Sequence, residues 1–172
     1  MTTIRTMIDE PTIHRRVQEL GREIRAHYGE QSVHAVCVLK GSLIFFADLV
    51  RAIGGDVTFD YIAVSSYGAG VTSSGQVRFD ADLSASIEGR HVLIIEDIVD
   101  TGRTMAALLE VLASRRPASV AVATLLDKPS RRVVEVPVRF TGFAIEDEFV
   151  VGYGLDFDQR YRALPFIGVV ES

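Results

Sequence analysis

The chain has 172 residues, of which 48% are hydrophobic and 24% are charged, and its formal net charge is −5 at pH 7. This length and composition are typical of one globular domain, here residues 1–172, that buries a core without disulfide or metal support. The acidic balance argues against a nucleic-acid partner, because such proteins neutralise phosphates with an excess of basic side chains.

The sequence also argues against several other classes of protein. No apolar run approaches the roughly 18 residues of a membrane span. The N-terminus lacks the apolar segment of a secretory signal, so we expect a cytoplasmic protein with no membrane partner. The single cysteine, Cys37, lies in an apolar run, which favours a buried and unreactive thiol. The four histidines lack the spacing and the cysteine partners of zinc ligands.

The first half of the chain alternates helical and extended patterns. Apolar residues at helical spacing predict an amphipathic helix over 10–28. The scarcity of polar residues over 33–39 predicts a central, parallel strand. A turn at 40–42 leads into a helix of about ten residues that ends near residue 53, and residues 57–64 predict the next strand.

The second half continues the alternation after a break. Residues 65–75 are small, polar and rich in glycine, which predicts a mobile loop. A short strand is expected at 77–79, a buried strand at 92–95, a helix at 104–112 and another strand at 120–126.

This order of elements predicts an α/β fold, with a parallel sheet flanked by helices on both faces. Residues 138–170 have short aromatic strands, several glycines and no helical pattern, so we expect them to form a small C-terminal hood over one end of the sheet. Ligands in such folds bind outside the carboxyl ends of the strands. The junctions at Lys40, Ser65, Glu96 and Lys128 are therefore expected to share one pocket.

Residues 91–105 carry the strongest functional signal. Two adjacent acids, Glu96 and Asp97, follow the apolar run, and a third acid, Asp100, precedes a small polar turn that opens a helix. Unpaired backbone N–H groups at a helix start form a phosphate site. Acids repel phosphate, so three of them beside such a site indicate a ligand that also brings hydroxyls, a metal or a proton. A sugar phosphate with Mg²⁺ meets that description.

The stretch EDIVDTGRTM resembles the ribose-phosphate signature of the type I phosphoribosyltransferases, in the form carried by hypoxanthine-guanine phosphoribosyltransferases. The resemblance extends from about Ile13 to Val170. It implies transfer of ribose 5-phosphate from phosphoribosyl pyrophosphate to a 6-oxopurine, hypoxanthine and with it guanine, in purine salvage. It also implies Mg²⁺ as cofactor and a homodimer or homotetramer.

The resemblance assigns roles within the signature. Asp100 is implied to be the general base that takes or holds the proton of purine N7. Glu96 and Asp97 are implied to bind the ribose hydroxyls, directly or through metal. The 5-phosphate is implied to lie against Thr101, Gly102, Arg103 and Thr104.

Outside the signature, the resemblance implies a pyrophosphate loop at Leu39, Lys40 and Gly41, where a plain strand-to-helix turn is the alternative. Gly41 allows backbone N–H groups to point at an anion. Arg162 corresponds to an arginine that approaches the pyrophosphate. Asp156 matches a second acid that binds Mg²⁺ there.

The remaining implied residues cover and select the base. Ser66 and Tyr67 match a lid that closes over the site. The alternative is that they belong to a disordered surface loop. Lys128 matches a lysine that donates to purine O6, and an ammonium group disfavours the amino group of adenine because it can only donate. Phe149 is implied to stack on the purine, and the backbone of Val150 to read its edge.

Two other functions remain open at this point. One is a regulator of the same fold that senses phosphoribosyl pyrophosphate, which the acidic charge and the lack of an added nucleic-acid-binding segment disfavour. The other is a transferase that prefers xanthine or a pyrimidine, which Asp100, Lys128 and Phe149 together disfavour.

Overall fold

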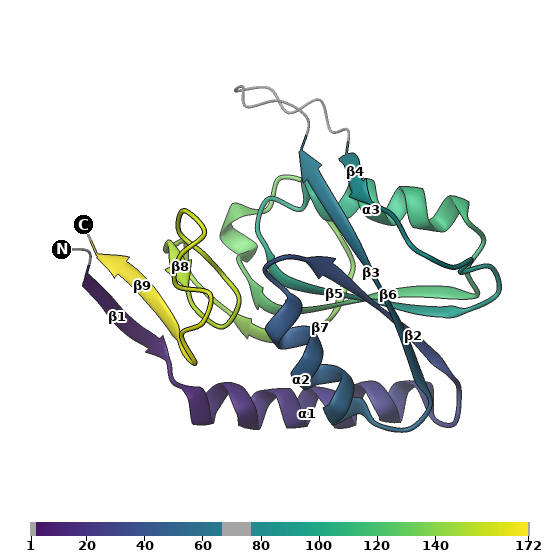
Figure 1. The fold of residues 1–172 in the computed structure, drawn as a ribbon, viewed down its shortest axis with the longest axis horizontal. Coiled ribbons are helices and arrows are strands. Elements are labelled where there is room, and N and C mark those ends of the chain that lie inside the picture. The colour runs from purple at the N-terminus through teal and green to yellow at the C-terminus, as the bar shows by residue number, and fades with distance from the viewer. Residues whose placement is uncertain (1–2, 67–76, 172) are drawn as a thin grey trace.

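The computed structural model describes residues 3–66 and 77–171, which form two sheets, three α-helices and one short 3-10 helix, Pro129–Arg131 (Figure 1). The helices are α1 (Glu10–Tyr28), α2 (Leu43–Ile53) and α3 (Arg103–Ser114). The larger sheet contains β2 (Val33–Leu39), β3 (Val57–Ser66), β4 (Val77–Ala81), β5 (His91–Val99), β6 (Ser119–Asp127) and β7 (Val138–Ala144). The smaller sheet contains β1 (Thr3–Ile8), β8 (Val150–Val151) and β9 (Ile167–Glu171).

The larger sheet has the strand order β4-β3-β2-β5-β6-β7. All neighbouring pairs run parallel except β3 and β4, which are antiparallel at one edge. The predicted α/β fold with a largely parallel sheet is confirmed. The carboxyl ends of β2, β5 and β6 therefore point to the same edge.

The limits of α1 follow from its ends. The Asp9 side chain accepts a hydrogen bond from the Thr12 backbone N–H (2.9 Å), and Gly29, at φ 58°, ends the helix. These signals are local in sequence, which is why the predicted and observed bounds agree. No helix in the described ranges is both long and apolar enough to cross a bilayer.

Helices cover both faces of the larger sheet, as predicted. On one face α1 and α2 pack in a core that includes Leu20, Phe45 and Leu93. On the opposite face α3 inserts Leu108 and Leu112 against neighbouring strands. Alternate residues of β2 point into the two cores, and Cys37 is buried in the first of them, as expected.

The extent of the hood differs from the prediction. Residues 138–144 belong to the larger sheet, where β7 pairs in parallel with β6, so the prediction that they form the hood was wrong. The N-terminal strand β1, which the sequence did not reveal, joins the hood by pairing antiparallel with β9. The hood thus consists of β1 and residues 145–171. A strand whose partner lies at the other end of the chain leaves no local signal.

Two boundaries also differ. β5 continues past Ile95 through the acids to Val99, because its pairing with β6 continues from Glu96 opposite Thr124 to Val99 opposite Asp127. Ser65 and Ser66 belong to β3 rather than to a loop. Residues 67–76, which include Tyr67 of the expected lid, lie outside the described residues.

Asp60 on β3 is a buried acid that holds the segment between β4 and β5. Its carboxylate accepts hydrogen bonds from the backbone N–H groups of Tyr61 and Ser84 (both 2.8 Å) and from the Ser84 hydroxyl (2.9 Å). Burial by itself would raise the pKa of Asp60, but these hydrogen bonds outweigh burial and lower its pKa. The ionised form is therefore the one that stabilises the fold.

We predict that Asp60→Asn lowers the free energy of unfolding at pH 6 by about 1–3 kcal/mol, the cost of unpaired buried donors. Because the folded pKa is depressed, the contribution is present above the unfolded pKa of about 3.9 and is lost as pH falls through the folded value. Urea unfolding between pH 3 and 6 measures this, with the exposed Asp56→Asn as control. An unchanged gap between wild type and Asp60→Asn at the lowest pH would contradict the prediction.

Candidate active site

The loops after β2, β5 and β6 meet at the carboxyl edge of the sheet. Gly41 lies so close to Asp97 that a Cβ atom on the glycine would be 1.7 Å from the Asp97 Oδ2 atom. The backbone N–H of Lys128 donates to the Val99 carbonyl (3.0 Å), which joins the start of the loop after β6 to the end of β5. The sheet therefore brings together the predicted pyrophosphate, ribose-phosphate and purine loops.

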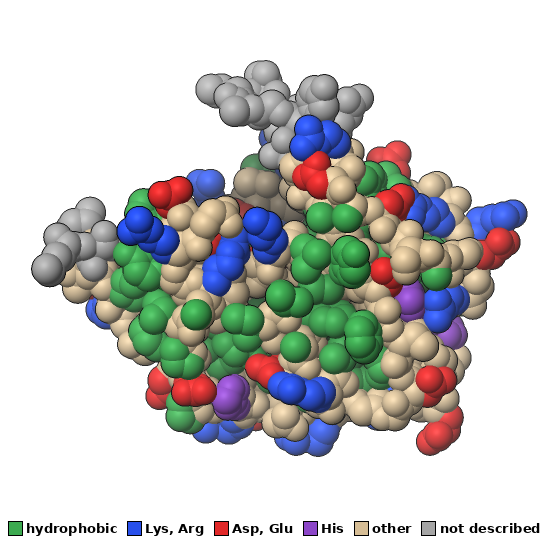
Figure 2. Space-filling model, in the orientation of Figure 1, with side chains coloured by type: hydrophobic (Ala, Val, Ile, Leu, Met, Phe, Trp, Pro, Cys, Tyr) green, Lys and Arg blue, Asp and Glu red, His purple; other side chains and the backbone are tan. Residues whose placement is uncertain are grey.

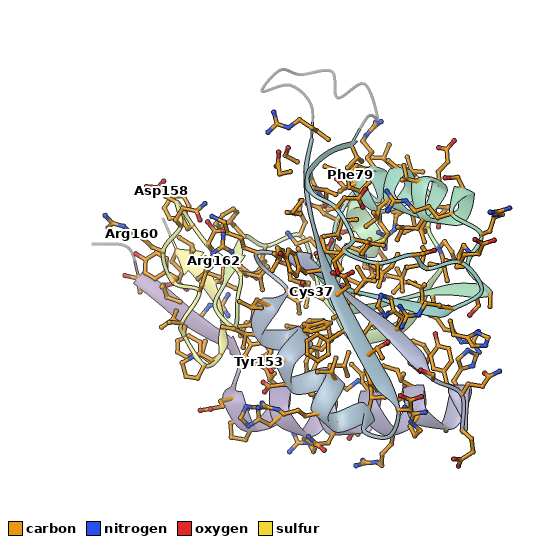
Figure 3. The ribbon with its side chains drawn as sticks, turned by 45° about the vertical axis from the view of Figure 1, so that its right-hand side comes forward. Cys37, Phe79, Tyr153, Asp158, Arg160 and Arg162 are labelled. Atoms are coloured by element: carbon orange, nitrogen blue, oxygen red, sulfur yellow. The ribbon has the colours of Figure 1, made fainter. Side chains whose placement is uncertain are left out.

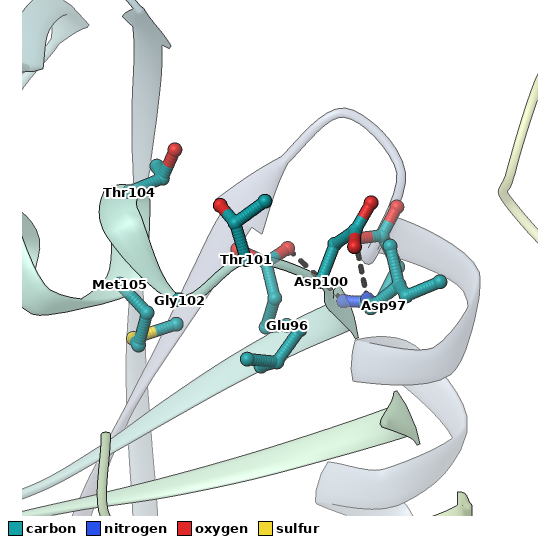
Figure 4. Close-up of a pocket in the computed structure, with 9 residues that line it drawn as sticks. Glu96, Asp97, Asp100, Thr101, Gly102, Thr104 and Met105 are labelled. Atoms are coloured by element: carbon teal, nitrogen blue, oxygen red, sulfur yellow. Dashed lines mark hydrogen bonds between the residues drawn. The ribbon is translucent and has the colours of Figure 1, made fainter. Parts of the chain in front are cut away.

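A pocket of about 170 Å³ opens between the acids and the start of α3 (Figure 4). Asp97 and Asp100 lie toward one side of it, and Thr104 lies toward the other. It is lined by Glu96, Asp97, Ile98, Val99, Asp100, Thr101, Gly102, Thr104 and Met105. Arg103 is exposed and is not among these lining residues, unlike the other three residues of the predicted phosphate turn.

The N-terminus of α3 faces the pocket without a side-chain cap among the described residues. Gly102 is the N-cap residue, at φ 85°, and a Cβ atom there would be 2.2 Å from the Val134 carbonyl oxygen. Both the positive φ of this residue and the lack of room for a side chain beside Val134 thus require glycine. The Arg103 N–H donates to the Thr101 hydroxyl (3.4 Å). The next N–H groups of the first turn and the helix dipole remain available to an anion.

Glu96 and Asp97 place two carboxylates next to each other at this edge. The Glu96 Oε1 atom accepts from the Asp97 N–H (3.0 Å), and the Asp97 Oδ1 atom accepts from the Ile98 N–H (2.7 Å). Burial, and then the neighbouring charge of Asp97, raise the pKa of Glu96 well above its ordinary value. A ligand that donates hydroxyl protons or brings a cation would relieve this repulsion.

Asp100 is held by two arginines that sequence analysis did not assign to the site. Arg131 pairs with the Asp100 carboxylate (3.2 Å), while Arg132 donates to the Asp100 backbone carbonyl (3.2 Å). Arg132 also forms an ion pair with Asp127, in which the two side chains are 9% and 15% exposed. The only feature of the sequence that could have indicated these contacts is that Arg131 and Arg132 closely follow Asp127 and Lys128.

Lys128 lies at the carboxyl end of β6, with a side chain only 8% exposed. Its ammonium group is 3.5 Å from the Asp147 carboxylate, which also pairs with Arg131 at 3.6 Å. Asp147 is another residue that sequence analysis missed. A buried ammonium with one distant partner has donor capacity left for a ligand.

The hood supplies the other predicted purine residues. Phe149 is 55% exposed, and its ring lies edge-on to that of Phe157 with centroids 5.6 Å apart. Val150 is buried in β8. An exposed aromatic ring beside a buried strand leaves a face on which a planar base can stack.

The predicted pyrophosphate residues come from two places. Leu39 ends β2, Lys40 is exposed, and Gly41 contacts Asp97 as described above. Arg162 in the hood pairs with Asp156 (2.9 Å) and donates to the Gly154 carbonyl (2.7 Å), so its contacts are within the hood.

The structure describes only part of the predicted lid, and it bears on the predicted metal ligands through the placement of acidic side chains. The described part of the lid is Ser66, which ends β3. Within residues 3–66 and 77–171, no three Asp, Glu, His or Cys side chains converge as a metal site. The predicted ligands Glu96, Asp97 and Asp156 therefore do not form an all-protein cage there.

The comparisons with known proteins agree with this geometry. A family model described as a phosphoribosyl transferase domain matches residues 5–158. The chain therefore belongs to the phosphoribosyltransferase family. This match confirms the resemblance seen in the signature.

Within that family, the similar proteins are hypoxanthine and hypoxanthine-guanine phosphoribosyltransferases. The hypoxanthine phosphoribosyltransferase of Haemophilus influenzae is 49% identical over 167 residues, covering 95% of this chain and 93% of that protein. A hypoxanthine phosphoribosyltransferase structure from Staphylococcus aureus has a TM-score of 0.94 at 42% identity, covering 97% and 91%. A hypoxanthine-guanine phosphoribosyltransferase structure from Bacillus anthracis has a TM-score of 0.95 at 40% identity, covering 98% and 100%.

We predict that Arg132→Met destabilises the fold by about 3 kcal/mol, because removing one partner leaves the other charge of a buried pair uncompensated. Arg131→Met is the matched control. That side chain is 48% exposed, so its ion pairs should contribute less than about 1 kcal/mol. Urea unfolding of both variants measures the difference. Equal losses would show that burial of the Arg132–Asp127 pair has no special effect.

Proposed function

We propose that this chain transfers the ribose 5-phosphate group of phosphoribosyl pyrophosphate to N9 of a 6-oxopurine, hypoxanthine and with it guanine, in purine salvage. The observation that carries the proposal is the pair of carboxylates, Glu96 and Asp97, beside an uncapped helix N-terminus. The names of the relatives support hypoxanthine as the base.

The two halves of the pocket suit the two halves of a sugar phosphate. Amide N–H groups of residues 101–104 and the dipole of α3 favour the 5-phosphate. The carboxylates of Glu96 and Asp97 favour the ribose hydroxyls, which are hydrogen-bond donors. Phosphate alone would be repelled by these acids, so a ligand that carries both groups explains the arrangement.

Asp100 is proposed as the general base. In the transfer, a bond forms between purine N9 and ribose C1′, the bond from C1′ to the pyrophosphate oxygen breaks, and pyrophosphate leaves with the bonding electrons. The proton lost from the imidazole ring passes from N7 to the Asp100 carboxylate. The exposed partner Arg131 has to release that carboxylate as the base binds, which costs little for a solvated pair.

The donor set fits Mg²⁺, which prefers oxygen ligands and is commonly held by one or two carboxylates together with substrate phosphates. Asp156, on the side proposed for pyrophosphate, would be its protein ligand, with Glu96 and Asp97 near the ribose. When bound, Mg²⁺ supplies positive charge that neutralises the leaving pyrophosphate. Lys40, the amide of Gly41 in the loop that begins after Leu39, and Arg162 would add donors on that side.

Base selection is proposed to come from Lys128 and Phe149. The Lys128 ammonium donates to O6 of hypoxanthine or guanine and has no acceptor for the amino group of adenine. Phe149 stacks on the ring, and the backbone of Val150 reads the edge of the base. Backbone groups at that edge distinguish hypoxanthine, guanine and xanthine only weakly.

We also propose that the chain forms a homodimer or homotetramer. Large apolar side chains gather on the face that carries α2 and β3 (Figure 2). Leu43 on α2 and Phe59 and Tyr61 on β3 are 54%, 67% and 52% exposed. Apolar groups exposed together on one face are typical of an interface.

Steady-state kinetics with phosphoribosyl pyrophosphate and Mg²⁺ test the function. We expect high kcat/KM with hypoxanthine and guanine and no turnover with adenine. Adenine turnover equal to that of hypoxanthine would contradict the role of Lys128. Absence of turnover with every purine would contradict the function itself.

We predict that Asp100→Asn lowers kcat about 10²–10³-fold, the range for loss of a general base, with a smaller change in substrate binding. The amide keeps the size of the side chain but accepts no proton. Stopped assays of nucleotide formation measure kcat, and Asp82→Asn, an exposed acid bound to Arg115 (2.7 Å), is the control. A near wild-type kcat in this variant would show that Asp100 is not the general base.

The only two lysines of the chain, Lys40 and Lys128, allow a crossed test. We predict that Lys128→Ala weakens binding of hypoxanthine and guanine by about 1.5–3 kcal/mol, the scale of a charged hydrogen bond. It should change the affinity for phosphoribosyl pyrophosphate little, and Lys40→Ala should do the reverse. Calorimetric titration of each variant with each ligand measures both, and an exchanged pattern would show that the two assignments are wrong.

A further inference from the structure

Tyr153 joins the hood to helix α2. Its side chain is 3% exposed, and its hydroxyl donates a hydrogen bond to the Asp48 carboxylate, which lies on the second turn of that helix. Asp48 also pairs with Arg51 one turn further on. Figure 3 shows Tyr153 where the C-terminal segment meets the helix. The contact bridges 105 positions of the sequence.

The backbone at Tyr153 is held in a conformation that a side chain disfavours. Tyr153 has φ 48°, between Gly152 at 98° and Gly154 at 105°. A residue other than glycine rarely occupies this left-handed region, so contacts of the side chain have to offset the strain. Burial and the Asp48 carboxylate raise the pKa of Tyr153, so the phenol stays a donor at neutral pH.

A second contact joins the same two parts of the molecule. The backbone of Gly154 packs on the pyrophosphate loop, where a Cβ atom on Gly154 would be 2.1 Å from the Gly41 carbonyl oxygen. The two parts also share an apolar core, in which Phe45 of α2 is buried together with Val150 and Leu155 of the hood. Apolar contacts are non-directional, so the hydrogen bond from Tyr153 to Asp48, further along α2, adds the directional contact that fixes the orientation of the hood on the helix.

We infer that the Tyr153–Asp48 hydrogen bond is a positioning contact that couples the two ends of the proposed site. It fixes the segment from Phe149 to Asp156 relative to the helix that follows the pyrophosphate loop. A ligand on residues 40–42 then also orders the purine side, and the linkage is reciprocal. This inference rests on the proposed function, since it assigns pyrophosphate and purine to these two ends.

Calorimetric titration with hypoxanthine, without and with saturating Mg²⁺ and inorganic pyrophosphate, measures the coupling as a ratio of the two Kd values. We expect pyrophosphate to tighten hypoxanthine binding about tenfold in the wild type, within the usual range of such couplings. Tyr153→Phe should reduce this factor to about two, while changing the affinity for hypoxanthine alone less. By reciprocity the same factor is obtained from pyrophosphate affinity at zero and saturating hypoxanthine.

Three further variants separate coupling from a general effect on the core. Asp48→Ala breaks the same bond from the helix side and should lose the coupling, whereas Asp48→Asn keeps an acceptor and should retain most of it. Tyr28→Phe is the matched control, because Tyr28 is 4% exposed and its hydroxyl has no hydrogen-bond partner among the described residues. It should keep the wild-type factor.

The possible results test the coupling through Tyr153 and Asp48 separately from the proposed function. Wild-type coupling in both Tyr153→Phe and Asp48→Ala, or an equal loss in Tyr28→Phe, would overturn the inference. Binding of both ligands by the wild type without any coupling would overturn it as well. A wild type that binds neither hypoxanthine nor pyrophosphate would instead overturn the proposed function.

Discussion

The close contact between the Asp97 carboxylate and the backbone of Gly41 is the constraint on which the rest of the site depends. No side chain fits between them, since even a Cβ atom would be 1.7 Å from the carboxylate oxygen. The loop after β2 therefore packs on the end of β5 at the carboxyl edge of the sheet. The hood reaches the same point through Gly154, so three distant parts of the chain meet there.

Charges around this point differ in how deeply they are buried. Behind the loop, the Arg132–Asp127 pair is nearly enclosed and fixes the backbone carbonyl of Asp100. Toward the pocket, Asp100 pairs with Arg131, a side chain that is about half exposed. A buried pair is costly to break and an exposed pair is not. A ligand can thus replace Arg131 as the partner of the Asp100 carboxylate while the buried Arg132–Asp127 pair stays intact.

The sequence predicted those features whose causes are local. The bounds of α1 follow from Asp9 and Gly29 at its ends, and the pocket of residues 96–105 lies within one stretch of chain. Pairing between distant segments was missed, as with β1 and β9 or the Arg132–Asp127 pair behind the loop. The end of β5 was misplaced because strand pairing with β6, rather than hydrophobicity, determines where it stops.

A crystal structure of the chain with inosine monophosphate tests the central claim most directly, which is that one edge of the sheet holds phosphate, ribose and base together. The account predicts the 5-phosphate against the amides of residues 101–104, the ribose hydroxyls at Glu96 and Asp97, and O6 within hydrogen-bond distance of the Lys128 ammonium. A nucleotide whose phosphate lies away from the start of α3, or whose base does not approach Lys128, would contradict it.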